Sequence, residues 1–194
     1  MAQTSVARRP VLLVHGLWNT AAIFVRLRAY LESRGWPVYA LNMTPSNGDV
    51  GIEVLAQQVA AFAQVHLNQP FDLVGFSMGG LVCRYYVQRL RAGQVQRLVT
   101  VSAPHHGSAL ALFRFNPGGR QMRPGSRFLR DLNRDLSVLT QLQFVSIWTP
   151  FDALVVPAWS SRLPVGQEQI VPVWSHNRMV WDQRGMGAIA AALS

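Results

Sequence analysis

The sequence contains no lysine and only one cysteine, Cys83, among its 194 residues. A single cysteine cannot form an intrachain disulfide, and it excludes a cysteine-rich metal site. No apolar run approaches the roughly 20 residues that a membrane-spanning helix needs. Charged residues make up only 14% of the chain, whereas 49% of its residues are hydrophobic, and this balance excludes intrinsic disorder. The chain is therefore expected to fold around an ordinary apolar core.

Because lysine is absent, arginine supplies all 18 basic side chains, and with nine acidic residues the net charge is +9. A basic excess can attract nucleic acid, an anionic membrane surface or anionic substrates, or it can be a compositional habit without a partner. No stretch of the sequence resembles a nucleic-acid-binding module. We therefore expect no nucleic-acid partner and keep an anionic lipid surface and acidic esters as alternatives.

The length fits one domain, and we find no internal repeat, linker or change in composition that would divide it. We expect a single domain over residues 1–194 that acts as a monomer. The first ten residues contain two arginines and no apolar run of signal-peptide length. These features predict a cytoplasmic protein.

Short apolar segments alternate with longer segments of helical period, which predicts a mostly parallel sheet of about six strands covered by helices on both faces. Asn19 and Asp49 precede two of the helical segments and are candidate N-caps. The expected strands are residues 11–14, 38–41, 71–76, 98–101, 144–148 and 170–174.

One stretch departs from this alternation. Residues 107–125 contain four glycines, two prolines and several arginines without a clear period. Because long irregular insertions in compact domains usually serve a function, we expect residues 107–140 to form a small lid or a rim around an active site.

The strongest chemical signal is Gly-Phe-Ser-Met-Gly-Gly at residues 75–80, between an expected strand and an expected helix. This is the context of a nucleophile elbow, in which a serine occupies a turn so tight that the residues two positions before and after it must be glycine. Ser77 is therefore the candidate nucleophile.

A serine hydroxyl needs a general base, and the base needs an orienting carboxylate. Asp152 and His176 follow the fifth and sixth expected strands, so both should lie at the carboxyl edge of the sheet, where ligands of open α/β sheets bind. His105 and His106 are the rival bases, but they precede any late acid in the chain. Asp131 and Asp135 lie on an arginine-rich helical stretch and are expected to form solvated ion pairs.

Two backbone N–H groups should stabilise the oxyanion: that of Met78, directly after the nucleophile, and that of Leu17, in the loop after the first strand. Apolar side chains near these segments are candidates for the substrate pocket, although each could equally belong to the core. They are Trp18, Phe113, Phe115, Leu154, Trp159 and Met179.

Taken together, these motifs resemble the α/β-hydrolase superfamily, specifically its small lipases and esterases of the triacylglycerol lipase and GPI inositol-deacylase-like group. The resemblance covers nearly the whole chain from Pro10 onward. It rests on residues 14–17, 75–80, 103–108, 122–129, 152–157 and 175–176.

The resemblance implies a minimal α/β-hydrolase without a large cap domain and without a cofactor or metal. Ser77, Asp152 and His176 would hydrolyse short- to medium-chain acyl esters or lipids through an acyl-enzyme. The alternatives are an acyltransferase that uses the same three residues and a non-catalytic binder of anionic surfaces. Six arginines fall within residues 107–140, at positions 114, 120, 123, 127, 130 and 134, so the basic excess should border the mouth of the site.

Overall fold

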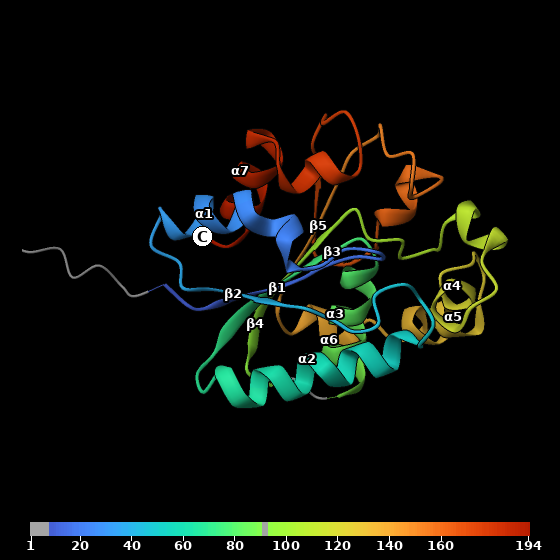
Figure 1. Ribbon diagram of the computed structural model, residues 1–194, viewed down its shortest axis with the longest axis horizontal. Coiled ribbons are helices and arrows are strands. Elements are labelled where there is room, and N and C mark those ends of the chain that lie inside the picture. The colour runs from blue at the N-terminus through green and yellow to red at the C-terminus, as the bar shows by residue number, and fades with distance from the viewer. Residues whose placement is uncertain (1–7, 91–92) are drawn as a thin grey trace, which may run out of the picture.

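The computed structural model describes residues 8–90 and 93–194, and its centre is a six-stranded sheet (Figure 1). The strands follow the order β2-β1-β3-β4-β5-β6, and every neighbouring pair is parallel. Their bounds are β1 (Val11–Val14), β2 (Val38–Leu41), β3 (Phe71–Phe76), β4 (Val95–Val101), β5 (Gln143–Trp148) and β6 (Gln167–Ile170). The expected α/β class with a parallel sheet is confirmed.

Helices cover both faces of the sheet (Figure 1). The α-helices are α1 (Val25–Glu32), α2 (Ile52–His66), α3 (Met78–Arg89), α4 (Pro117–Gln121), α5 (Arg127–Arg134), α6 (Ser137–Thr140) and α7 (Gln183–Ala192). Short 3-10 helices are η1 (Ala21–Phe24), η2 (Ala109–Phe113), η3 (Ala158–Ser161) and η4 (Asn177–Val180). The segment expected to be irregular therefore contains the short helices η2 and α4.

The alternation of side chains along the strands divides the core into two layers. On β1, Leu12 and Val14 pack in the layer under α2 and α3, whereas Val11 and Leu13 point to the layer under α1 and α7. All four side chains are fully buried, as expected for a central strand of a sheet covered on both faces. Because β1 and β3 are neighbouring interior strands, the segments that follow them lie side by side at the carboxyl edge of the sheet.

Both expected N-caps are wrong. Thr20, not Asn19, caps η1 by accepting the Ala22 N–H, at 3.3 Å. Asp49 instead accepts hydrogen bonds from Asn47 and Asn116. The helix α2 begins three residues later, and the N–H of Ile52 donates to the Gln121 side chain, at 2.6 Å. The side chain of Gln121, 69 residues away in the sequence, thus accepts the N–H at the start of α2, a role that the local sequence predicts for Asp49.

The sixth strand is also displaced from its expected position at residues 170–174. The strand is β6, a polar and largely exposed edge strand, and it ends at Ile170. Pro172 has no N–H to continue the ladder, and the Val173 N–H turns back to the Val171 carbonyl at 2.8 Å. The apolar residues Val171 and Val173 are buried because this irregular segment packs into the core, not because it forms a strand.

Candidate active site

Ser77 lies in the turn between β3 and α3, with φ 56° and ψ −126°. Residues other than glycine rarely adopt such angles, and holding them costs about 1–3 kcal/mol. The turn closes because Gly79 lacks a side chain: a Cβ there would overlap the carbonyl oxygens of Val14 and His15. A Cβ on Gly75 would lie 2.6 Å from the Gly79 oxygen. The two glycines of the expected elbow are therefore required by close backbone packing.

Asp152 and His176 lie side by side, and the imidazole Nδ1 is 2.7 Å from the Asp152 Oδ2. The second carboxylate oxygen, Oδ1, accepts the backbone N–H groups of Leu154 and Val155, each at 2.9 Å. Burial by itself raises the pKa of the Asp152 carboxyl, but the hydrogen bond and charge of His176 and the two backbone donors together lower it below its ordinary value. The carboxylate is thus ionised at neutral pH, so the His176 Nδ1 carries the hydrogen and its Nε2 is left to accept a proton.

The ring of Phe76, directly before the nucleophile, packs against the His176 imidazole with 4.8 Å between centroids. Both residues are buried. The imidazole is therefore held from two sides, by the Asp152 carboxylate and by an aromatic ring on the strand that carries Ser77.

Ser77 and His176 share one cavity of about 430 Å³, which lies within the roughly 300–1,000 Å³ of small-molecule sites. Three of the expected pocket residues lie on its wall and are exposed at its mouth: Trp18 (69%), Phe113 (80%) and Leu154 (52%). The rest of the wall is formed by Leu17, Asn19, Pro104, Ser108, Leu110, Ala111, Arg114, Met122, Val155 and Asn177.

The structure does not place the other three pocket candidates on this wall. Met179 is fully buried in the core layer under α1 and α7. Phe115 is 72% exposed with the Arg123 guanidinium over its ring, and Trp159 lies exposed on η3. Apolarity and position in the chain could not separate these residues from Trp18 or Leu154, because only the tertiary fold decides which side a loop presents.

The loop after β1 lies directly against the nucleophile. A Cβ on Gly16 would be 2.8 Å from the Ser77 Cβ, so the backbone of this loop approaches as closely as it can. Within the described part of the chain, neither the Leu17 N–H nor the Met78 N–H donates a hydrogen bond. Both expected oxyanion donors are thus backbone groups beside Ser77 whose hydrogens have no intramolecular acceptor among these residues.

The rival histidine His105 is occupied elsewhere. It is fully buried, and its Nδ1 accepts from Arg84 at 3.2 Å while its Nε2 lies 3.0 Å from the Thr100 hydroxyl. Burial, followed by the charges of Arg84 and His106, lowers the pKa of His105 well below its usual value. His105 is therefore a neutral structural residue with both ring nitrogens engaged.

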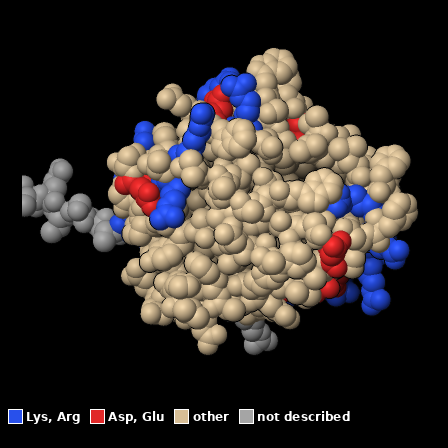
Figure 2. Space-filling model, viewed as in Figure 1, with Lys and Arg blue, Asp and Glu red and all other residues tan. Residues whose placement is uncertain are grey.

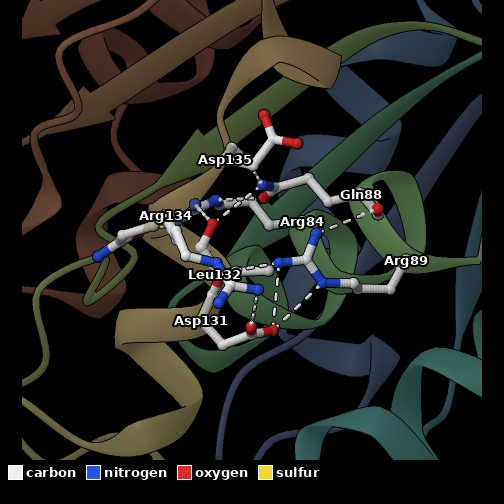
Figure 3. A network of polar contacts seen from close by, with 8 residues as sticks. Arg84, Gln88, Arg89, Asp131, Leu132, Arg134 and Asp135 are labelled. Carbon is white, nitrogen blue, oxygen red and sulfur yellow. Dashed lines mark hydrogen bonds and ion pairs between the residues drawn. The ribbon is translucent and has the colours of Figure 1, made fainter.

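Arg84 is the centre of a buried polar network that ties α5 to α3 (Figure 3). Its guanidinium donates to the Leu132 carbonyl at 3.1 Å and to the Asn133 side chain at 3.0 Å. Gln88, one turn along α3, donates to the Leu132 and Asp135 carbonyls. Burial, and then the charge of Arg89, lower the pKa of Arg84 to about 9. These bonds hold the second half of residues 107–140 against the helix that begins at the nucleophile.

The arginines of residues 107–140 do not form one basic rim. Of the six, only Arg114 lies on the cavity wall; Arg120 and Arg127 line a separate groove with Glu53 and Asp131. Asp131 pairs with Arg89 and Arg134, as expected of a solvated ion pair, whereas Asp135 instead accepts the Ser137 N–H. Figure 2 shows the charged side chains of the face that it draws in separate groups with a wide uncharged area between them.

Among residues 8–90 and 93–194, no helix has the length and apolarity to cross a bilayer. The same residues contain no group of three or more His, Cys, Asp or Glu side chains that could hold a metal ion.

The architecture and the position of the elbow define an α/β-hydrolase fold. The mature form of the Bacillus licheniformis lipase BlEst2 superimposes with a TM-score of 0.78 over 97% of this chain and 93% of that one, at 17% sequence identity. The sequence model of the palmitoyl protein thioesterase family matches residues 10–123, and the chain belongs to this family. The resemblance to α/β-hydrolase lipases and esterases is thereby confirmed, with the palmitoyl protein thioesterases as the family that matches.

Two curated relatives each match about half of the chain. Palmitoyl-protein thioesterase 3 of Dictyostelium discoideum is 33% identical over 108 residues, which cover 52% of this chain and 37% of that protein. The pimeloyl-[acyl-carrier protein] methyl ester esterase of Neisseria meningitidis is 35% identical over 89 residues, 43% of this chain and 27% of that protein. The chain thus matches only between about a quarter and little more than a third of the length of these curated relatives.

Proposed function

We propose that the protein is a serine hydrolase that cleaves carboxylic esters or thioesters through an acyl-enzyme. The observation that carries the proposal is the 2.7 Å hydrogen bond between His176 and Asp152 at the wall of the cavity that also contains Ser77. The membership in the palmitoyl protein thioesterase family and the likeness to esterases support the same chemistry.

In the first step, the Ser77 Oγ attacks the carbonyl carbon and its proton passes to the His176 Nε2. The tetrahedral intermediate collapses, the bond to the alcohol or thiol breaks, and the leaving group takes the proton from His176. In the second step a water molecule gives its proton to the same nitrogen and attacks the acyl carbon. The carboxylic acid leaves, and the proton returns to Ser77.

Two features of this chain lower the barrier. The Asp152 carboxylate orients the imidazole and stabilises its charged form in both steps. The N–H groups of Leu17 and Met78 would receive the oxyanion, and one such donor is worth about 3–4 kcal/mol of transition-state stabilisation.

The cavity favours an acyl chain of short to medium length. Trp18, Leu110 and Leu154 give its wall an apolar character, while its moderate volume limits the chain that it can enclose. Thioesters are included because the family match points to them.

A chain-length series of p-nitrophenyl esters and acyl thioesters, with wild type and Ser77→Ala, tests this function. We expect wild type to hydrolyse both classes with an optimum at short or medium chains and Ser77→Ala to be inactive. A serine-directed phosphonate should label Ser77 in the wild type alone. Equal hydrolysis by both proteins would show that Ser77 is not the nucleophile.

We further propose that the mouth of the cavity makes transient contact with an anionic lipid surface. The cavity wall includes the exposed apolar side chains of Trp18, Phe113 and Leu154, and the protein carries a net charge of +9. Sedimentation with phosphatidylcholine vesicles, with and without phosphatidylglycerol, tests this contact. Phe113→Ser should weaken binding to the anionic vesicles, and equal recovery of both proteins would argue against it.

A further inference from the structure

Arg114 places a positive charge on the wall of the cavity that contains Ser77 and His176. Its guanidinium lies over the Trp18 ring, with 4.2 Å from Cζ to the ring centroid. Its Nη2 donates to the Asn47 carbonyl at 2.8 Å. These contacts come from the loops after β1 and β2, so the guanidinium is held in a defined position beside the cavity.

This charge has no carboxylate partner within residues 8–90 and 93–194. The carboxylate of Asp152 is hydrogen-bonded to His176 and to two backbone N–H groups, so it does not pair with Arg114. Asp49, on the neighbouring loop, accepts from Asn47 and Asn116 instead. Arg97, which is half-buried like Arg114, pairs with Asp72. Arg84 and Arg123 also lack a carboxylate in this part of the chain, but they donate several hydrogen bonds to carbonyl and amide oxygens.

The guanidinium also keeps unused donors. Of the five N–H groups of an arginine, the Arg114 side chain uses one on Asn47, and its Nη1 donates to no residue of the described chain. Its Nε is buried and has no acceptor among these residues. A cation that is held in place on the wall of a cavity and keeps donors without acceptors in the described chain is suited to bind an anionic group of a ligand.

We propose that Arg114 binds an oxyanionic group, a carboxylate or a phosphate, that the substrate carries near its scissile bond. The proposal rests on the hydrolase function above and narrows its substrates to anionic esters and thioesters. The guanidinium fork matches the geometry of such groups, and the ring of Trp18 holds the guanidinium in place on the cavity wall.

Three chromogenic substrates test the proposal and locate the anion. 4-Nitrophenyl butyrate is neutral, 3-carboxy-4-nitrophenyl butyrate carries a carboxylate on the leaving group, and 4-nitrophenyl hydrogen glutarate carries one on the acyl group. A hydrogen bond between charged groups at a partly exposed site is worth about a tenfold change in affinity. Arg114→Gln should therefore raise KM about tenfold for whichever anionic substrate places its carboxylate at Arg114, and this substrate shows whether the anion belongs to the leaving group or to the acyl group. The KM for the neutral ester should change less than about twofold.

Arg120→Gln is the matched control, because it removes the same charge from an exposed residue outside the cavity wall. It should leave all three KM values unchanged. If Arg114→Gln changes KM by the same factor for all three substrates, Arg114 only supports the wall and the proposal is wrong. If Arg120→Gln reproduces the effect of Arg114→Gln, only the net charge matters and the proposal is equally wrong.

Two further measurements keep the proposal testable if Arg114→Gln fails to fold. Arg114→Lys retains the charge but loses the fork, so it should raise the anionic KM by about threefold. In wild type, raising NaCl from about 0.05 M to about 0.5 M should raise the KM of the anionic substrate and not that of the neutral one. The proposal is wrong if the ratio of the anionic to the neutral KM is the same in wild type and Arg114→Lys and does not change with the salt concentration. Full activity of Ser77→Ala would instead refute the hydrolase mechanism, which is a separate result.

Discussion

Replacement of Asp152 by asparagine should remove almost all activity while it leaves the fold intact. The two carboxylate oxygens have different partners: Oδ1 accepts two backbone N–H groups, from Leu154 and Val155, and Oδ2 faces the His176 Nδ1. In Asp152→Asn the amide oxygen must take the place of Oδ1, because an NH₂ group cannot accept those two hydrogens. The amide NH₂ then faces His176.

This orientation reverses the tautomer of the histidine. A donor opposite Nδ1 requires that nitrogen to accept, so the hydrogen of the neutral imidazole moves to Nε2, the nitrogen that must take the proton of Ser77. The substitution in the corresponding position of a serine protease lowers kcat by about 10⁴, and we expect a loss of 10³ to 10⁴, about 4–5.5 kcal/mol of activation free energy.

The assay is the kcat for a p-nitrophenyl ester, measured beside circular dichroism and urea unfolding. Asp135→Asn, which changes an exposed aspartate remote from the cavity wall, is the control and should keep full activity. Asp152→Asn should unfold at nearly the wild-type urea concentration, because its amide preserves both backbone hydrogen bonds. If it retains more than about a tenth of the wild-type kcat, the assigned role of Asp152 and the tautomer argument are both refuted.

Three further predictions concern stability. Ser77→Gly should abolish hydrolysis but raise the free energy of unfolding by about 1 kcal/mol, since glycine adopts the φ of 56° without strain; lower stability in urea unfolding would contradict the strain. Gly79→Ala should cost about 3 kcal/mol or more, because its Cβ would overlap the Val14 oxygen, whereas Gly187→Ala, within α7 and with only a 3.7 Å contact, should stabilise by about 0.5–1 kcal/mol. Burial raises the pKa of Asp72 to about 6, against the opposing effect of Arg9. A raised pKa means that the folded state holds the proton more tightly, so the free energy of unfolding should fall by up to about 3 kcal/mol as the pH rises from about 4 to about 7. Asp72→Asn should remove this decline. If the free energy of unfolding changes with pH in the same way in Asp72→Asn and wild type, Asp72 is not its cause.

Much of the fold follows from local features of the sequence. Four of the six expected strands begin and end within one residue of those observed, because each is a continuous apolar run that a doubly covered parallel sheet requires. The position predicted for the sixth strand is wrong because the prediction relied on an apolar run. The edge strand β6 is polar, and the apolar residues that follow it form a buried loop. The cap expected at Asn19 is wrong by one residue, because the Thr20 hydroxyl accepts the Ala22 N–H. The cap expected at Asp49 is wrong because Gln121, from a distant segment, accepts the first N–H of α2.

The position of the candidate nucleophile could likewise be predicted, because the elbow is a local motif whose glycines are needed by its own backbone. The order of residues along the chain then selected Asp152 and His176, and the structure brings them to 2.7 Å of each other. His105 could be set aside on firm grounds only in the structure, where the buried side chain of Arg84 occupies its Nδ1.

The absence of lysine and the excess of arginine were read from the sequence, but the sequence could not say where each arginine points. Six arginines within one segment suggested a basic rim, yet the structure buries parts of that segment, pairs Arg134 with an aspartate and turns only Arg114 toward the cavity. The sequence by itself determined the sheet, the elbow and the types of residue that catalysis requires. Only the tertiary structure decided which side chains line the cavity and which of the six arginines lies on its wall, because both depend on contacts between segments far apart in the chain.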